Sequence, residues 1–223
     1  MIASGTIGAF KGILFDFDGV LAQSMEDHAA AWIAAIASFG GTVTFDDYMP
    51  LEGSKLTEVA NVLWEKSGLP GWCDPAAVSR AKEEYYLRNH HFRFYPGVES
   101  FIDILNGKGV AIAIVTASLS SNLQATVPAE FLKKFRAVVT GDQVPRGKPF
   151  PDPYLVGAEH LGLLASQCIV VENSPLGVAA AKAAGAYCIG ITSTVSAEIL
   201  KEADLIIPSF EDLSSQEIIK HLL

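Results

Sequence analysis

The stretch FDFDG at residues 15–19 constrains the fold of this 223-residue chain more than any other. An apolar run at residues 13–15 precedes two carboxylates, and Gly19 ends the stretch. Such a run is typical of a strand buried on both faces of a parallel sheet. Residues two apart in a strand point the same way, so Asp16 and Asp18 are expected to share one side. Two anions this close need a cation or a shared proton, and the alternative is an ordinary solvated Asp-Gly turn.

The composition limits the class of protein and its partners. Half of the residues are hydrophobic and 18% are charged, which excludes global disorder and suits one large domain or two modest ones. The net charge of −9, from 16 basic and 25 acidic residues, disfavours broad binding to nucleic acid or anionic membranes. No apolar run approaches a membrane span, and residues 1–10 lack the basic start of a secretory signal.

The cysteines and histidines point away from disulfides and zinc. Cys73, Cys168 and Cys188 form no CxxC pair, and the last two lie in apolar runs where free cysteine acts as a core residue. A reducing, cytoplasmic compartment is expected. The five histidines show no HxxxH or HExxH spacing, so zinc is not expected.

Strand-like and helix-like segments alternate along most of the chain. This pattern predicts an α/β fold, a Rossmann-like parallel sheet with helices on both faces. Residues 25–94 interrupt the alternation with helical pieces only, which predicts an all-helical cap domain inserted into a core made of residues 1–24 and 95–223. Strands are expected at 13–15, 110–115, 137–140, 168–171, 187–191 and 205–207, and helices at 24–39, 44–49, 55–66, 75–89, 98–108, 120–125, 129–135, 153–161, 175–184 and 215–222.

Polar side chains follow three of the predicted core strands. Ligands of open α/β sheets bind outside the carboxyl ends of the strands, so these side chains are expected to converge on one crevice. Lys148 comes from a loop between two strands and is expected at the same edge, although a solvated loop lysine is the commoner case. The side chains at the three strand ends are Asp16 and Asp18, then Thr116 and Ser118, then Glu172 and Asn173.

Carboxylates, a hydroxyl and a single lysine suit a hard divalent cation beside an anionic substrate. Ligands that are all oxygen favour Mg²⁺ over zinc or copper. The residues themselves therefore favour phosphate chemistry.

Four motifs in register give the chain a family resemblance. They are residues 16–20 (DFDGV), Thr116, residues 147–149 (GKP) with Asp152, and residues 171–174 (VENS) followed by Gly177. The chain resembles the haloacid dehalogenase superfamily of aspartyl-phosphate hydrolases and mutases, and within it the β-phosphoglucomutase-like and sugar-phosphatase subfamily. The resemblance runs from about residue 11 to 208.

The resemblance implies roles for the motif residues. Asp16 would be the nucleophile, and Asp18 the general acid and base whose backbone carbonyl also binds Mg²⁺. Thr116 and Lys148 would hold the phosphoryl oxygens. The phosphoryl group and substrate would also meet Gly19, Ala117 and Ser118, and Glu172 with Asn173 would complete the Mg²⁺ site.

Asn173 departs from the pattern of many relatives, which carry an acid at this position. The amide keeps a carbonyl oxygen but removes one negative charge, so weaker Mg²⁺ binding is predicted. Ser174 is a candidate to support the ligand shell.

Three residues of the helical segment are candidates for substrate contact. His28 is expected either to touch Asp18 across the hinge or to pack between core and cap. Lys55 aligns roughly with an arginine that grips the second phosphate of the substrate in β-phosphoglucomutase, and Lys82 with a substrate-facing cap lysine. Solvated helix charges are the alternative for both lysines.

These features predict a Mg²⁺-dependent phosphatase of small phosphorylated metabolites, sugar phosphates in particular. The alternatives are a β-phosphoglucomutase-like mutase and, from another class, a non-catalytic binding protein with the same fold. A phosphonoacetaldehyde hydrolase with Lys55 as Schiff-base nucleophile, or a haloalkanoate dehalogenase, is disfavoured because Asp18 is present. A monomer is expected, and the sequence does not specify the physiological substrate.

Overall fold

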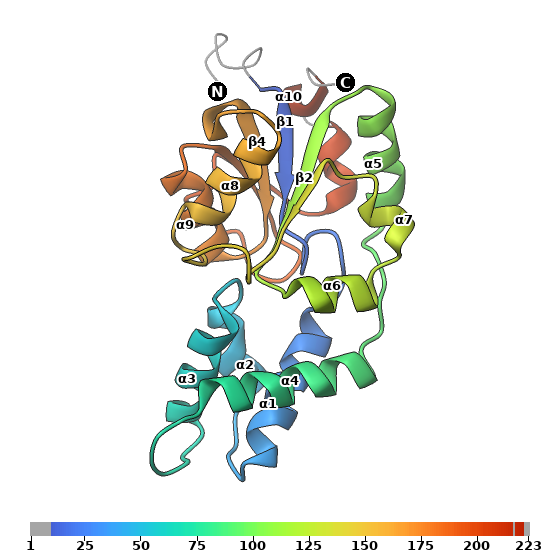
Figure 1. Ribbon diagram of the computed structural model, residues 1–223. Helices are drawn as coiled ribbons and strands as arrows, with labels where there is room; N and C mark the ends of the chain where they lie inside the picture. Colours follow the sequence, from blue (N-terminus) through green and yellow to red (C-terminus); the bar gives the residue numbers. More distant parts are fainter. Residues whose placement is uncertain (1–9, 216, 221–223) are drawn as a thin grey trace.

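The central element is a six-stranded sheet in which every neighbouring pair of strands is parallel (Figure 1). The computed structural model describes residues 10–215 and 217–220. The strand order is β3-β2-β1-β4-β5-β6, and Phe15 of β1 pairs with Ile114 of β2 and Val171 of β4. The predicted parallel sheet is confirmed. The strands are β1 (Gly12–Phe15), β2 (Ala111–Val115), β3 (Ala137–Val139), β4 (Cys168–Glu172), β5 (Tyr187–Ile191) and β6 (Leu205–Ile207).

Helices cover both faces of the sheet, as predicted. Side chains alternate along each strand, so Ile13 and Phe15 enter one hydrophobic cluster and Leu14 enters the other. The first cluster is covered by α5 (Val98–Gly107), η3 (Phe210–Ser215) and α10 (Glu217–Lys220). The second is covered by α8 (Asp152–His160) and α9 (Pro175–Ala183). Cys168 and Cys188 belong to the second cluster and are free and fully buried.

The segment between β1 and α5 forms a separate group of helices beyond the carboxyl ends of the strands (Figure 1). It has a hydrophobic cluster of its own that includes Trp32, Ile36 and Leu63. Its helices are α1 (Met25–Ser38), α2 (Phe45–Tyr48), η1 (Met49–Leu51), α3 (Leu56–Lys66) and α4 (Pro75–Asn89). We refer to this group as the cap.

The two chain crossings between the sheet and the cap lie side by side. Ala22 forms an antiparallel bridge with Phe94, and the amide of Gln23 donates to the carbonyl of Arg93. A paired two-strand connection of this kind suits a hinge, because its few residues absorb any change in the angle between the two units.

Most predicted helices agree with the observed ones to within about one residue at each end, and two differ more. The segment expected at 129–135 forms α7 (Ala129–Leu132) and then turns, with Phe131 and Phe135 both buried against each other at 5.3 Å between ring centroids. The helix expected at 215–222 is α10, and residues 216 and 221–223 lie outside the described part of the chain. The remaining elements are α6 (Ser120–Thr126) and η2 (Ala165–Gln167). Among the described helices, none combines the length and apolar character needed to cross a membrane.

Candidate active site

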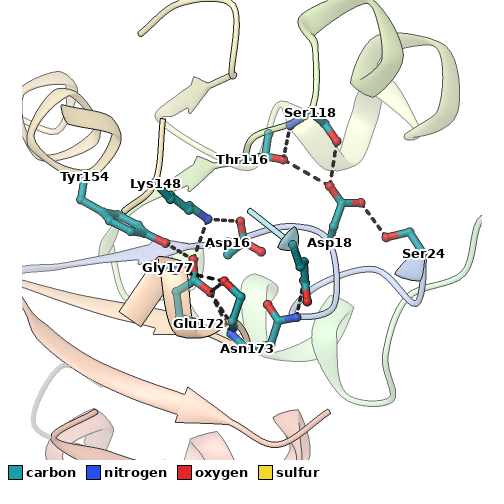
Figure 2. Close-up of polar contacts among 12 residues, drawn as sticks. Asp16, Asp18, Ser24, Thr116, Ser118, Lys148, Tyr154, Glu172, Asn173 and Gly177 are labelled. Carbon is teal, nitrogen blue, oxygen red and sulfur yellow. Dashed lines mark hydrogen bonds and ion pairs between the residues drawn. The ribbon is translucent and has the colours of Figure 1, made fainter. Parts of the chain in front are cut away.

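The predicted site residues converge at the carboxyl ends of β1, β2 and β4. β1 lies between the other two strands, and the strand order reverses there, which places a crevice at this point of the sheet. Figure 2 shows the side chains that follow these strands gathered together with Lys148 from the loop before α8.

Lys148 connects the two ends of the carboxylate cluster. Its Nζ donates to Asp16 Oδ1 at 2.5 Å and to Glu172 Oε1 at 2.6 Å (Figure 2). The hydroxyl of Tyr154 donates to the same Glu172 oxygen at 2.6 Å. All four side chains are buried, so water screens these ion pairs little. The hydrogen bonds therefore hold the side chains firmly in this arrangement.

The loop that carries Lys148 is itself held in place. Arg146 donates from Nε and Nη2 to both carboxylate oxygens of Asp152, at 3.0 and 2.9 Å. This two-pronged contact ties the loop to the first residue of α8. Asp152 of the third motif therefore orients the loop rather than the reacting groups.

The electrostatics of Asp16 favour a bound proton or cation. Burial is the largest influence and raises its pKa to about 8, and the carboxylates of Glu172 and Asp18 act in the same direction against Lys148. Burial alone would lower the pKa of Lys148, but the charges of Asp16 and Glu172 outweigh it and raise that pKa above its usual value. Lys148 therefore stays charged, while Asp16 readily binds a proton or a cation.

Glu172 is surrounded by hydrogen-bond donors. Its Oε2 accepts from the amides of Asn173 and Ser174 and from the Ser174 hydroxyl, at 2.9, 3.1 and 3.1 Å, while Oε1 accepts from Lys148 and Tyr154. Direct coordination of a metal would require Glu172 to release one of these donors. In this structure the carboxylate orients Lys148 and the turn into α9, and its expected part in completing the Mg²⁺ site stays a prediction.

Asp18 accepts four side-chain hydrogen bonds, two on each oxygen. Oδ1 accepts from Ser24 at 2.6 Å and from His28 at 3.0 Å, and Oδ2 accepts from Ser118 at 2.8 Å and from Thr116 at 3.3 Å. Burial would raise the pKa of Asp18, but His28 and the hydroxyl donors outweigh it and hold the pKa well below the usual range. Asp18 is therefore ionised and hydrogen-bonded on the side where Thr116 and Ser118 follow β2.

His28 links Asp18 to Lys82 of the cap. Lys82 Nζ lies 2.9 Å from His28 Nδ1, and an ammonium group only donates, so Nδ1 accepts and Nε2 carries the proton that is donated to Asp18. The imidazole stacks on the ring of Tyr86 at 4.2 Å. Lys82 is 2% exposed and also donates to Glu83, at 2.8 Å. The structure shows the expected contact of His28 with Asp18, and the side chain is at the same time buried between core and cap.

Lys55 lines a small cavity beside Thr116 and Lys148, next to the one that Asp16 and Asp18 line. Its Nζ donates to the carbonyls of Val144 and Pro145, each at 2.8 Å, so it joins the start of α3 to a loop of the core. Two of the three N–H donors of the ammonium group are used by these carbonyls, and the expected contact with a second substrate phosphate stays a prediction. The amide of Gly19 is likewise used, since it donates to the carbonyl of Ala22 at 2.8 Å.

A small cavity lies between the carboxylates and the cap. Its volume is about 40 Å³, enough for a few water-sized spheres but not for a sugar phosphate, so a substrate needs the cap to move away from the sheet. Lys82 is the one lysine or arginine among the described residues that line it. The lining includes Asp16, Asp18, His28, Glu52, Thr116, Ala117 and Ser118.

The site also contains buried acceptors suited to a cation. Asn173 Oδ1 and Glu52 Oε2 have no hydrogen-bond partner among the described residues. Burial and the neighbouring Asp16 carboxylate hold the pKa of Glu52 well above its usual range, so a cation bound here would have to displace a proton from this carboxyl group. Three or more His, Cys, Asp or Glu side chains do not cluster as a metal centre anywhere in the described part of the chain, so a Mg²⁺ ion here would need amide, backbone or substrate oxygens as well.

Sequence reasoning missed Tyr154 and Glu52. Tyr154 was recognisable only as an inward-facing residue of a predicted helix. Glu52 stood beside Gly53 in the cap with no motif to distinguish it, and its contact is with Asn173, 121 positions away.

The fold and the site together define a hydrolase. It has an α/β core with an inserted helical cap, and paired carboxylates after β1 that suit a phosphorylated substrate. The family model of haloacid dehalogenase-like hydrolases matches residues 13–191, and the chain belongs to this family of enzymes.

Relatives of known name agree with this assignment. The chain is 32% identical over 206 residues to hexitol phosphatase A of Escherichia coli, covering 92% of this chain and 93% of that protein. It is 31% identical over 207 residues to the chloroplastic protein Suppressor of quenching 1 of Arabidopsis thaliana, covering 91% of this chain but only 20% of that much longer protein. The solved β-phosphoglucomutase of Clostridium difficile shares the fold, with a TM-score of 0.81 at 22% identity over 96% of this chain and 97% of that one.

Proposed function

We propose that this protein is a Mg²⁺-dependent phosphatase of small phosphorylated metabolites, with sugar phosphates as the substrate class and Asp16 as the nucleophile. The observation that carries the proposal is the cavity between cap and sheet, which brings Asp16, Asp18 and Thr116 together. The similarity to hexitol phosphatase A supports the substrate class.

In the first half of the reaction, an Asp16 oxygen attacks phosphorus and the bond from phosphorus to the leaving oxygen breaks. Lys148 remains charged beside Asp16 and stabilises the negative charge on the phosphoryl oxygens, together with the Thr116 hydroxyl. The leaving oxygen takes a proton from the Asp18 carboxyl, which has to bind that proton when the substrate enters, since the closed site holds Asp18 ionised.

In the second half, water attacks the phosphorus of the aspartyl-phosphate and Asp16 is released. Asp18 takes the proton from this water, a role that requires the ionised carboxylate that the structure shows. Free phosphate and the regenerated Asp16 carboxylate are the result.

Mg²⁺, held by Asp16, the Asp18 carbonyl and Asn173 Oδ1, would neutralise charge on the nucleophile and on the transferred group. The buried, unpartnered Asn173 oxygen supports this assignment. A divalent charge beside Asp16 also favours its ionised form, which attack requires.

The small number of cationic side chains near the cavity favours hydrolysis over the mutase reaction. A mutase of this family type needs a second cationic group for the distal phosphate, and Lys55 is used by the carbonyls of Val144 and Pro145. The same contact uses two of the N–H donors of Lys55, and a lysine whose Nζ is hydrogen-bonded as a donor is not the free amine that a Schiff base needs. Lys82 is the remaining candidate, but it is bound to His28 and Glu83.

The test is phosphate release from a panel of sugar and hexitol phosphates with and without Mg²⁺. Asp16→Asn is expected to abolish release, while Asp46→Asn, an exposed acid of the cap, is expected to leave it unchanged. Conversion of β-glucose 1-phosphate to glucose 6-phosphate in the presence of a bisphosphate primer, without phosphate release, would instead support the mutase.

The setting of the enzyme is proposed from its cysteines. Cys73, Cys168 and Cys188 are all free and buried, which suits a reducing compartment such as the cytoplasm. We propose a monomer whose partner is the small phosphorylated substrate.

A further inference from the structure

Glu52 is a cap residue that reaches the core at the end of β4. It follows η1 (Met49–Leu51) and is 5% exposed, although it carries a carboxylate. Asn173 Nδ2 donates to Glu52 Oε1 at 2.6 Å and to Thr194 Oγ1 at 3.0 Å. The neighbouring Gly19 leaves the room for this contact, since a Cβ there would lie 2.1 Å from Asn173 Nδ2.

The contact leaves one acceptor of each partner without a hydrogen bond. Glu52 Oε2 and Asn173 Oδ1 are both buried, and neither has a partner among the described residues. A buried acceptor without a partner destabilises a folded protein, so native sites normally supply a donor, a water or an ion. Glu52 lines the cavity together with Asp16 and Asp18, and Asn173 is in contact with Glu52. Two buried oxygens without a donor, on side chains in contact beside these carboxylates, suit a site that receives a cation.

We propose that Glu52 belongs to the cation site of this enzyme and supplies, from the cap, the negative charge that Asn173 does not provide from the core. The proposal rests on the Mg²⁺ dependence proposed above. One consequence is that the cation site is complete only when the cap lies against the sheet. Cation binding and cap closure then favour each other, because each is stronger when the other has occurred.

The charge at the site is consistent with this assignment. Asp16 and Glu172 already share Lys148, so that lysine does not balance Glu52 as well. Asn173 donates to Glu52 but carries no charge. An acid at position 173 would place two carboxylates in contact, whereas the amide lets the carboxylate of the cap approach to 2.6 Å.

The test is Mn²⁺ binding without substrate, measured by the electron paramagnetic resonance signal of free Mn²⁺, with Mg²⁺ as competitor. Glu52→Gln is expected to weaken Mn²⁺ binding at least tenfold. Glu58→Gln removes one exposed carboxylate from the same group of helices and is expected to bind like the wild type. Adding Asn173→Asp to Glu52→Gln returns the carboxylate from the core side and is expected to recover most of the lost affinity.

A second readout separates a local effect from misfolding. The increase in melting temperature caused by Mn²⁺ is expected to shrink in Glu52→Gln, while the metal-free protein still unfolds cooperatively. Glu52→Asp keeps the charge with a shorter side chain and is expected to bind Mn²⁺ with intermediate affinity.

Wild-type affinity in Glu52→Gln, within twofold, would overturn the proposal, as would a wild-type protein that binds no Mn²⁺. Because substrate is absent, these results are independent of turnover. Phosphate release with unchanged Mn²⁺ binding in Glu52→Gln removes the inference and leaves the phosphatase standing. Mn²⁺ binding that depends on Glu52, without phosphate release, would support the inference about Glu52 and contradict the proposed phosphatase activity.

Discussion

At the scale of single residues, Asp16 is a buried acid in a cluster with too few positive charges. Its pKa is raised from 3.8 to about 8, with burial as the main cause. Between these two values the folded protein binds more protons than the unfolded chain, so stability falls as the pH rises through this window.

This gives a prediction for the metal-free protein. In buffer with a chelator, the free energy of unfolding is expected to decrease from pH 5 to pH 8 more steeply in the wild type than in Asp16→Asn, by up to about 1.4 kcal/mol per pH unit. Urea unfolding at each pH measures both slopes. Parallel slopes for the two proteins would show that Asp16 does not titrate in this window.

Lys82 is a positioning residue for proton transfer at Asp18. It donates to His28 Nδ1 and so fixes the proton on Nε2, facing Asp18. In Lys82→Met the ring is free to change tautomer, and kcat is expected to fall at least tenfold with little change in KM, because general acid–base catalysis contributes about 10²- to 10⁴-fold.

The pH dependence of kcat separates this role from simple packing. The acid limb is expected to shift in Lys82→Met and to recover partly in Lys82→Arg, since arginine also only donates. Lys66→Met, at an exposed lysine of α3, is the matched control. A fall in kcat with an unshifted pH profile would indicate a structural role alone.

Sequence predicted the residues at the strand ends and missed contacts that depend on the cap. Asp16, Thr116 and Glu172 follow apolar runs, and the carboxyl ends of parallel strands lie at one edge, so their convergence follows from local pattern. The partners of Glu52 and Lys55 lie 121 and 89 positions away, and they depend on how the cap rests on the sheet. No local periodicity carries that information.

At the scale of elements, the turn from β4 into α9 holds the carboxylate of Glu172 in place. Ser174 is the N-cap of α9, where its hydroxyl accepts from the Gly177 amide at 3.1 Å and also donates to Glu172. Sequence could predict the strand and the helix here because the apolar runs are clear. The tight approach of helix to carboxylate depends on Gly177, and only the three-dimensional structure shows how close that approach is.

Gly177→Ala tests this packing. A Cβ at this position would lie 1.7 Å from Glu172 Oε1, so either the carboxylate or the first turn of α9 has to move. The variant is expected to lose about 1–3 kcal/mol of stability through overpacking and to lose activity, because Lys148 then loses one anchor.

Gly107→Ala is the control for this substitution. Gly107 ends α5, and a Cβ added there would meet no atom within 4 Å, so alanine is expected to be neutral or slightly stabilising. Urea unfolding of both variants gives the comparison. Equal stabilities would mean that Glu172 moves aside without cost.

At the scale of the whole molecule, a short cap segment supplies two of the polar contacts between cap and core. Glu52 meets Asn173 at the end of β4, and Lys55 donates to the carbonyls of Val144 and Pro145. The cavity beneath is only about 40 Å³, so this is a closed arrangement that a substrate has to open. Cap closure after binding would then exclude water other than the attacking molecule.

Lys55→Met is expected to weaken this closure. The variant removes two hydrogen bonds of 2.8 Å between cap and core but no group of the proposed catalytic machinery. Amides of residues 142–147 are expected to exchange with deuterium at least threefold faster than in the wild type, and KM for the best substrate is expected to rise several-fold. Lys66→Met, which loses only a contact to Asp47 within the cap, is expected to change neither quantity. If Lys55 instead bound a second phosphate, Lys55→Met would lower activity selectively on bisphosphates. The exchange of residues 142–147 would then be unchanged, because the hydrogen bonds from Lys55 to the carbonyls of Val144 and Pro145 would not be what holds the cap in solution.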